Sequence, residues 1–207
     1  MLRSLFAAAL MLFSSAAMAA DEPRHSVLMR QGAIEIRDYA PMIMAEVEVM
    51  GGSMGGASNA GFRPLANFIF GDNIAPQGGS GEIAMTTPVT QRRSQEIAMT
   101  TPVTQQAQGD NWRVGFVMPA EFTMETLPRP NDPRVAISQV PARRMAAIRF
   151  NGGPSDRRFT AKEAELLSWL GENGYEVTGE PVYARYDPPW VPTPFRRNEV
   201  MVEIAGR

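Results

Sequence analysis

One ten-residue segment, EIAMTTPVTQ, occurs twice in this chain, at residues 82–91 and again at residues 96–105. In both copies the isoleucine, methionine and valine fall on one parity, with glutamate and alanine on the other. This two-residue period is typical of a β-strand, whose successive side chains point to opposite faces of a sheet. The fold therefore has to accommodate two identical strands, and we expect them to pair as a hairpin across the polar residues 92–95.

Proline limits how far either copy can run inside a sheet. Pro88 and Pro102 lack the N–H group that would donate to a neighbouring strand, so we expect each copy to leave the sheet there or to follow an edge. The sequence leaves two interpretations of the repeat open. It is either a short duplication whose copies both pair, or a segment with a direct role in binding a ligand.

Alternating apolar residues predict strands along most of the remaining chain. Single strands are expected at residues 43–49, 112–118, 181–186 and 199–204, and hairpins at 27–39 and 134–150. The second hairpin is expected to turn at Pro141 and Ala142. Glu46 and Glu48 lie on the polar parity of their strand, which indicates a solvated face.

Two segments have the period of a helix instead. The first is expected from about Ser58 to Phe70, or from Arg63 if Pro64 sits in its first turn. Its apolar stripe has the spacing i, i+3, i+4, i+7 and consists of Phe62, Leu65, Ala66 and Ile69. The second is expected to begin at Thr160, with Glu163 completing a capping box, and to end at Gly174.

The order hairpin, helix, strands occurs twice, at about residues 27–118 and 134–204, on either side of a proline-rich connector at 127–133. Antiparallel strands with two helices indicate an α+β fold of two similar halves, not a parallel βαβ arrangement.

The N-terminus has the features of a secretory signal. Arg3 is followed by an apolar run at residues 5–13 that is too short to span a bilayer, and Ala17-Met18-Ala19 matches an A-x-A cleavage site. We therefore predict a signal peptide at 1–19, a single domain at 20–207, a periplasmic or secreted location, and no membrane span after cleavage. Removal of Arg3 changes the net charge from -2 to -3, which gives no reason to expect a nucleic-acid partner.

The residue types exclude much catalytic chemistry. The chain has no cysteine and a single histidine, His25, which we expect to be a solvated side chain near the mature N-terminus. Ser-His-Asp catalysis requires a histidine held in a cleft, and histidine-rich metal sites require several. We therefore predict no catalytic residues, no metal ligands and no enzyme activity.

What remains is suited to binding. Fourteen methionines supply adaptable apolar surface, most of it expected in the core. The loop at residues 187–198 combines the aromatic side chains of Trp190 and Phe195 with the guanidinium groups of Arg196 and Arg197. The arginines could pair with the carboxylates of a flat apolar ligand, or with local acids such as Asp187 and Glu199.

Several motifs in order along the chain resemble the SOUL haem-binding family. They are IEIRDYAP at 34–41, FRPLANFIFGDN at 62–73, IAMTTPV at 83–89 and 97–103, VGFVMP at 114–119, LPRPNDPRV at 127–135, VPARRMAAIRFNG at 140–152 and YDPPWVPTPFRRNEV at 186–200. The resemblance implies a distorted antiparallel β-barrel flanked by two helices. It also implies a haem or other tetrapyrrole bound in an apolar cleft beside the first helix, partly covered by the loop before the last strand.

The implied site residues follow from that resemblance. The cleft would be lined by Phe62, Leu65, Ala66 and Ile69 on the helix and by Trp190 and Phe195 on the loop, with Arg63, Arg196 and Arg197 as partners of the propionates. Haem would be held without a histidine axial ligand. Two alternatives stay open: a carrier of small amphiphilic ligands on the same barrel and, less favoured, a hydrolase.

Overall fold

The computed structural model describes residues 22–76, 95–188 and 190–206. The strands of the main sheet are β1 (His25–Gln31), β2 (Ile34–Tyr39), β3 (Met42–Met50), β5 (Val103–Gln108), β6 (Asn111–Val117), β8 (Val135–Val140), β9 (Arg143–Asn151), β10 (Val182–Arg185) and β11 (Arg197–Glu203). The helices are α1 (Met54–Ile69), α2 (Asp156–Glu172) and the short 3-10 helix η1 (Thr193–Phe195), and β4 (Asn73–Ile74) pairs separately with β7 (Arg129–Pro130).

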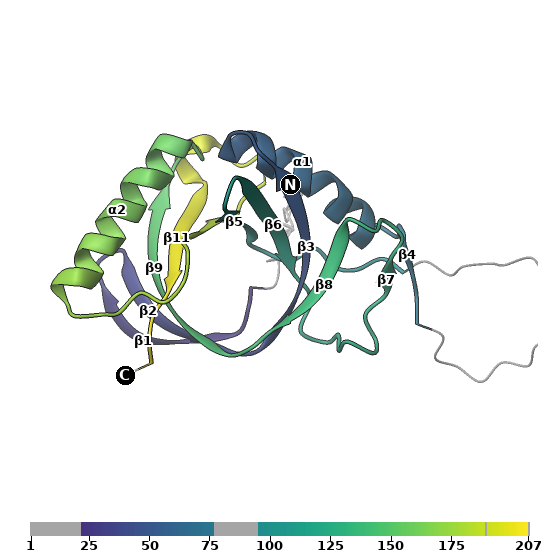
Figure 1. Ribbon diagram of the computed structural model, residues 1–207, viewed down its shortest axis with the longest axis horizontal. Helices are drawn as coiled ribbons and strands as arrows, with labels where there is room; N and C mark the ends of the chain where they lie inside the picture. Colours follow the sequence, from purple (N-terminus) through teal and green to yellow (C-terminus); the bar gives the residue numbers. More distant parts are fainter. Residues whose placement is uncertain (1–21, 77–94, 189, 207) are drawn as a thin grey trace, which may run out of the picture.

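The nine main strands form one antiparallel sheet that curls into a distorted barrel with the helices outside it (Figure 1). Its order is β1-β2-β9-β11-β10-β5-β6-β3-β8. The β2–β9 ladder ends where Tyr39 faces Arg143, and the β3–β8 ladder resumes where Met42 faces Val140. The β2–β3 junction at Pro41 and the β8–β9 junction at Pro141 therefore bend at the same place in the sheet. This shared bend curls the sheet around the barrel.

The sheet order records an internal repeat. The first half runs β2-β3-α1-β5-β6 and the second runs β8-β9-α2-β10-β11. The counterparts in the two halves are β2 and β8, β3 and β9, β5 and β10, and β6 and β11. Exchanging each strand for its counterpart turns the order from β2 to β8 into the same order read backwards, from β8 to β2. The expected α+β fold of two similar halves, a distorted antiparallel barrel flanked by two helices, is confirmed.

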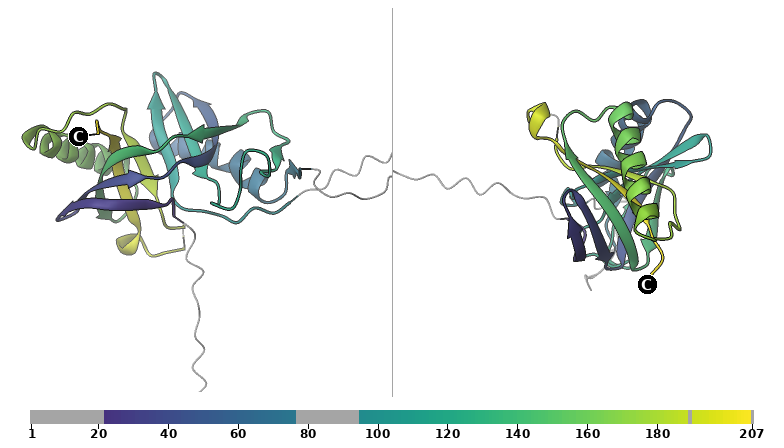
Figure 2. Two further views of the ribbon diagram at one scale, coloured as in Figure 1. Left: turned by 90° about the horizontal axis from the view of Figure 1, so that it is seen from below. Right: turned by 90° about the vertical axis from the view of Figure 1, so that its left-hand side faces the viewer.

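Each helix covers the outer face of its own half. Helix α1 contacts β3 and β6, and α2 lies across β9 and β11 (Figure 2, right). The α1 core includes Leu65, Phe68, Ile69, Val114 and Phe116, and the α2 core includes Ile148, Phe159, Leu166, Leu170 and Val202. In the described part of the chain, neither helix has the length and apolar character needed to cross a bilayer.

Both helices begin earlier than the sequence predicts. Helix α1 starts at Met54, because Ser53 caps it by accepting a hydrogen bond from the Gly56 N–H group, and because Met54 and Ala57 are buried. Pro64 consequently lies inside the helix, not in its first turn.

The predicted capping box of α2 is wrong. Ser155 is the N-cap residue and Thr160 lies inside the helix. The predicted end is correct, because Gly174 adopts φ 70° and the Tyr175 N–H group donates to the Leu170 carbonyl oxygen at 3.0 Å, which closes a glycine-terminated helix end.

Strand pairing also differs from expectation. β8 and β9 exist, but they do not form a hairpin: β8 pairs with β3, and β9 lies between β2 and β11. The first copy of EIAMTTPVTQ lies outside the described residues, as does most of its link to the second copy. In the second copy residues 95–102 are irregular and strand β5 begins only at Val103, so Pro102 precedes the strand instead of ending it.

Candidate functional site

The predicted ligand stripe on α1 is divided between the core and the surface. Leu65 and Ile69 are buried among the side chains of β3 and β6. Phe62 is 39% exposed, and its ring meets that of Phe116 edge-on with 5.4 Å between the centroids. Arg63 is exposed and Ala66 is partly so. The assignment of these residues to a ligand site stays a prediction, with Leu65 and Ile69 in this conformation supporting the surface from below.

The loop between β10 and β11 rests on the corner between β9 and α2. The Gly152 N–H group donates to the Arg196 carbonyl oxygen at 2.9 Å, and Thr193 approaches Gly153 closely. Trp190 and Phe195 are 82% and 72% exposed. The contacts with Gly152 and Gly153 therefore join the loop to the second half of the barrel.

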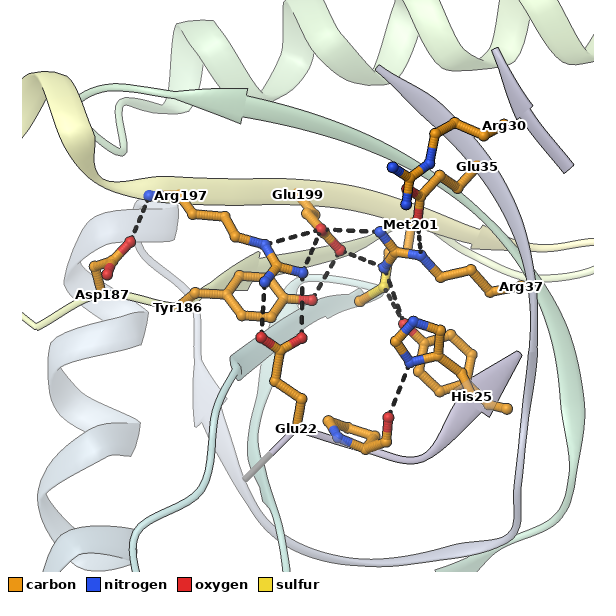
Figure 3. A network of polar contacts seen from close by, with 12 residues as sticks. Glu22, His25, Arg30, Glu35, Arg37, Tyr186, Asp187, Arg197, Glu199 and Met201 are labelled. Carbon is orange, nitrogen blue, oxygen red and sulfur yellow. Dashed lines mark hydrogen bonds and ion pairs between the residues drawn. The ribbon is translucent and has the colours of Figure 1, made fainter. Parts of the chain in front are cut away.

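The two loop arginines have different surroundings. The Arg196 Nε group donates to the Val191 carbonyl oxygen at 2.8 Å, within the loop itself. The Arg197 side chain points into the barrel, where it bonds to Glu199 and to Glu22 and lies over the Tyr186 ring at 3.7 Å (Figure 3). For Arg197, the alternative of pairing with Glu199 is thus the one that the structure adopts.

A buried network of charged groups surrounds Glu199. Two guanidinium groups reach its carboxylate: Arg37 Nη1 lies 2.6 Å from Oε2, and Arg197 Nη2 lies 2.8 Å from Oε1 (Figure 3). The Tyr186 hydroxyl also donates to Oε2 at 2.8 Å. Arg37 in turn bonds to Glu35 at 2.7 Å. Because every charge in this network has an opposite partner, it forms a rigid, internally compensated wall of the barrel.

The pKa values of this network favour its charged form. Burial alone would raise the pKa of Glu199, but the hydrogen bonds and charges of Arg37 and Arg197 outweigh it and hold the pKa below its ordinary value. Burial, followed by the neighbouring Glu199 charge, raises the pKa of Tyr186, so its hydroxyl stays protonated and can donate. Glu199 is therefore an anion held by cations, not a general acid.

His25 is not the solvated chain-end residue that we expected. It belongs to β1, where it faces Tyr39 across the ladder, and their ring centroids are 4.9 Å apart. Its Nδ1 atom is 2.9 Å from the carbonyl oxygen of Pro23. Pairing with β2 thus holds the single histidine beside the barrel interior.

A cavity of about 520 Å³ lies inside the barrel, and the sequence did not predict it. Four methionines line it, Met42, Met44, Met145 and Met201, together with polar side chains that include Glu46 and Arg143. On β3, Ala45 and Val47 face α1 while Met44 and Glu46 face the cavity. The expected solvated face therefore holds at Glu48, which is exposed, but Glu46 is half-buried in the cavity wall.

One signal in the sequence could have indicated this cavity. Methionines occupy the same parity as Glu46 and Glu48, at positions 42 and 44, so that face is only partly polar. Arg37 gave no such signal, because its partner Glu199 is 162 positions away.

Known structures share this fold. The chain resembles the C-terminal domain of EcmrR, with a TM-score of 0.60 and 12% identity over 84% of this chain and 98% of that one. It also resembles a hydrolase from Listeria innocua, with a TM-score of 0.56 and 14% identity over 86% of this chain and 94% of that one. At these identities the likeness shows the fold alone.

Sequence comparison identifies the family. No curated protein matches the chain. The profile of the SOUL heme-binding proteins matches residues 20–203, a span that contains every strand and both helices of the barrel. The chain belongs to the SOUL heme-binding protein family.

Proposed function

We propose that this protein binds haem or a related tetrapyrrole, as a binding protein and not as an enzyme. The observation that carries the proposal is membership of the SOUL family over residues 20–203. The fold neighbour that is a hydrolase does not weigh against it, because 14% identity relates the folds and not the chemistry.

The outer face of α1 offers a surface suited to a flat macrocycle. Phe62, Ala66 and Phe70 follow the spacing i, i+4, i+8, and Phe62 and Phe70 are 39% and 59% exposed. Exposed aromatic side chains on one line form an apolar ridge of the kind that marks binding sites. We place the tetrapyrrole against this α1 ridge, with Leu65 and Ile69 packed beneath it.

Charge on the ligand would be met from the same helix. Arg63 is exposed beside Phe62, and its guanidinium could pair with a propionate. Arg197 is a poor partner for a propionate, because Glu22 and Glu199 already hold its guanidinium. Trp190 and Phe195, exposed on the loop before β11, could cover such a ligand.

Haem fits this ridge through apolar contact and charge pairing instead of strong axial ligation. Met54 is the one residue of α1 able to ligate iron, and it is buried in the core. In the described ranges no cluster of three or more His, Cys, Asp or Glu side chains could hold a metal ion. Bound haem would supply a redox-active iron, while the protein supplies the surface and the guanidinium.

A hemin titration of residues 20–207 tests the proposal. We expect a saturable change in the Soret absorbance. Arg63→Gln should weaken binding by up to about 1 kcal/mol, the contribution of an ion pair at an exposed position. Arg157→Gln removes an exposed guanidinium from α2 and serves as the matched control, expected to leave affinity unchanged.

Two outcomes would count against different parts of the proposal. If the wild-type protein shows no saturable Soret change, tetrapyrrole binding is wrong. If it binds but Phe62→Ala with Phe70→Ala has no effect, the placement on α1 is wrong.

We further propose that the protein acts in the periplasm or outside the cell. The proposal comes from the signal-like residues 1–19, which lie outside the described part. N-terminal sequencing of protein recovered from the periplasmic fraction should find a chain beginning at Ala20. Recovery of a chain that still begins at Met1 would contradict export with cleavage.

A further inference from the structure

The cavity inside the barrel has the size and lining of a ligand site. Its volume of about 520 Å³ lies within the range of roughly 300–1,000 Å³ typical of small-molecule pockets. A barrel of about eight strands has room inside for one small ligand. Met42, Met44 and Met145 line one region of the wall, and their flexible thioether side chains adapt to apolar groups of irregular shape.

Arg143 supplies a weakly paired guanidinium to this cavity. Its Nε atom is buried and has no hydrogen-bond partner, the one such side-chain atom among the residues that the structure describes. The nearest carboxylate is that of Glu203, whose Oε2 atom is 3.8 Å from Arg143 Nη1. The side chain is 25% exposed and this long contact is its one ion pair in the described residues, so a ligand carboxylate in the cavity could pair with its accessible guanidinium nitrogens.

The other charged groups around the cavity have partners. Arg113 stands opposite Glu48 across the β3–β6 ladder and donates to Gln108, while Glu48 accepts from Asn111. The Glu46 carboxylate accepts a hydrogen bond from the Ser138 hydroxyl at 2.9 Å. The cavity therefore presents a guanidinium without a close acid partner, with which an anionic oxygen pairs best.

We propose that the barrel interior binds a small amphiphile with a single carboxylate head, its carboxylate on Arg143 and its apolar chain along the methionines. This site is on the inner face of the sheet, whereas α1 covers the outer face. It is therefore separate from the α1 ridge, and the two proposals can fail independently.

A displacement assay tests the chemistry of the head group on the unmodified protein. Dansyl-labelled undecanoic acid reports occupancy by its fluorescence. Decanoate, decanol and decyltrimethylammonium share one chain length and differ in head charge. We expect decanoate to displace the probe most strongly and the cation least. Equal or stronger displacement by the cation would overturn the proposal.

Variants test where the amphiphile binds. Arg143→Gln should weaken decanoate about tenfold or more while leaving decanol nearly unchanged. Arg144→Gln is the matched control, because this neighbouring guanidinium lies on the outer face and pairs with Asp38. Val140→Phe adds volume at a half-buried position that lines the cavity and should abolish binding of the probe. Undiminished probe binding by a folded Val140→Phe protein would place the site elsewhere and contradict the proposal.

Discussion

Arg37 and Glu199 form a two-point ion pair inside the barrel, with Nη1–Oε2 at 2.6 Å and Nη2–Oε1 at 3.0 Å. Their side chains are 3% and 0% exposed, so neither charge can turn to water if the other is removed. The pair joins β2 to β11 across β9, and it therefore links the first hairpin to the last strand.

We expect Glu199→Gln to lower the free energy of unfolding by about 3–5 kcal/mol, because it leaves buried guanidinium groups without their anion. Urea unfolding of the mature protein measures the change. Glu203→Gln on the same strand, where the carboxylate is partly exposed, should cost less than about 1 kcal/mol. Similar decreases in the free energy of unfolding for the two variants would show that burial does not determine how much the Arg37–Glu199 pair contributes to stability.

Stability should fall in acid through the same carboxylate. The folded-state pKa of Glu199 lies below its ordinary value of 4.5, so the unfolded chain binds a proton more readily than the folded one. The contribution is fully present above about pH 4.5 and is lost as pH falls through the folded pKa. Thermal unfolding from pH 7 to pH 3 should therefore show a steeper acid decline for the wild type than for Glu199→Gln. Parallel pH curves for the two proteins would contradict this role.

Gly61 sets how closely α1 approaches the barrel. A Cβ atom at this position would lie 2.6 Å from the Val114 Cβ atom, so the helix would have to move away from β6. Gly61→Ala should therefore destabilise the protein by about 1–3 kcal/mol. Gly55 lies in the same helix with no atom within 4 Å, and Gly55→Ala should instead stabilise it by up to about 1 kcal/mol. Chemical unfolding distinguishes the two, and equal effects would argue against the close packing.

The second copy of EIAMTTPVTQ should be sufficient for folding. Ile97 is buried against α1, and Gln105 donates from β5 to the Met54 carbonyl oxygen at 2.8 Å. Asn73 bonds to the Phe68 carbonyl oxygen and to two backbone atoms of Gln95, and Gly81 could supply the latter two after deletion of residues 82–95. We expect this deletion to change the free energy of unfolding by less than about 1 kcal/mol, since loop-closure entropy varies slowly with length. Loss of the folded state would show that the first copy has a structural role.

Local patterns were sufficient to predict most of the elements. The alternation in residues 27–39 predicts the β1–β2 hairpin, and the stripe of Leu65 and Ile69 identifies a buried helix face. The start of α1 was harder to predict from the sequence. Pro64 argued for a later start, and the earlier start depends on the burial of Met54 and Ala57, which only the structure shows.

Pairing and site geometry could not be read in the same way. Residues 134–150 look like a hairpin, yet β8 and β9 each join a strand of the first half. Arg196 and Arg197 are neighbours with the same charge, yet one bonds within its loop and the other enters the barrel. The exposure of the loop aromatic residues Trp190 and Phe195 was likewise not readable from their sequence.

The amino-acid sequence by itself determined the strands, the two helices, their duplication and membership of the SOUL family, because these depend on periodicity and motifs that are local in the chain. Only the tertiary structure decided which face of each strand lines a cavity and that, of the two loop arginines, Arg197 is held by the carboxylates of Glu22 and Glu199. Those properties depend on contacts between residues far apart in sequence, such as Arg37 and Glu199, and arise only when the sheet curls and brings them together.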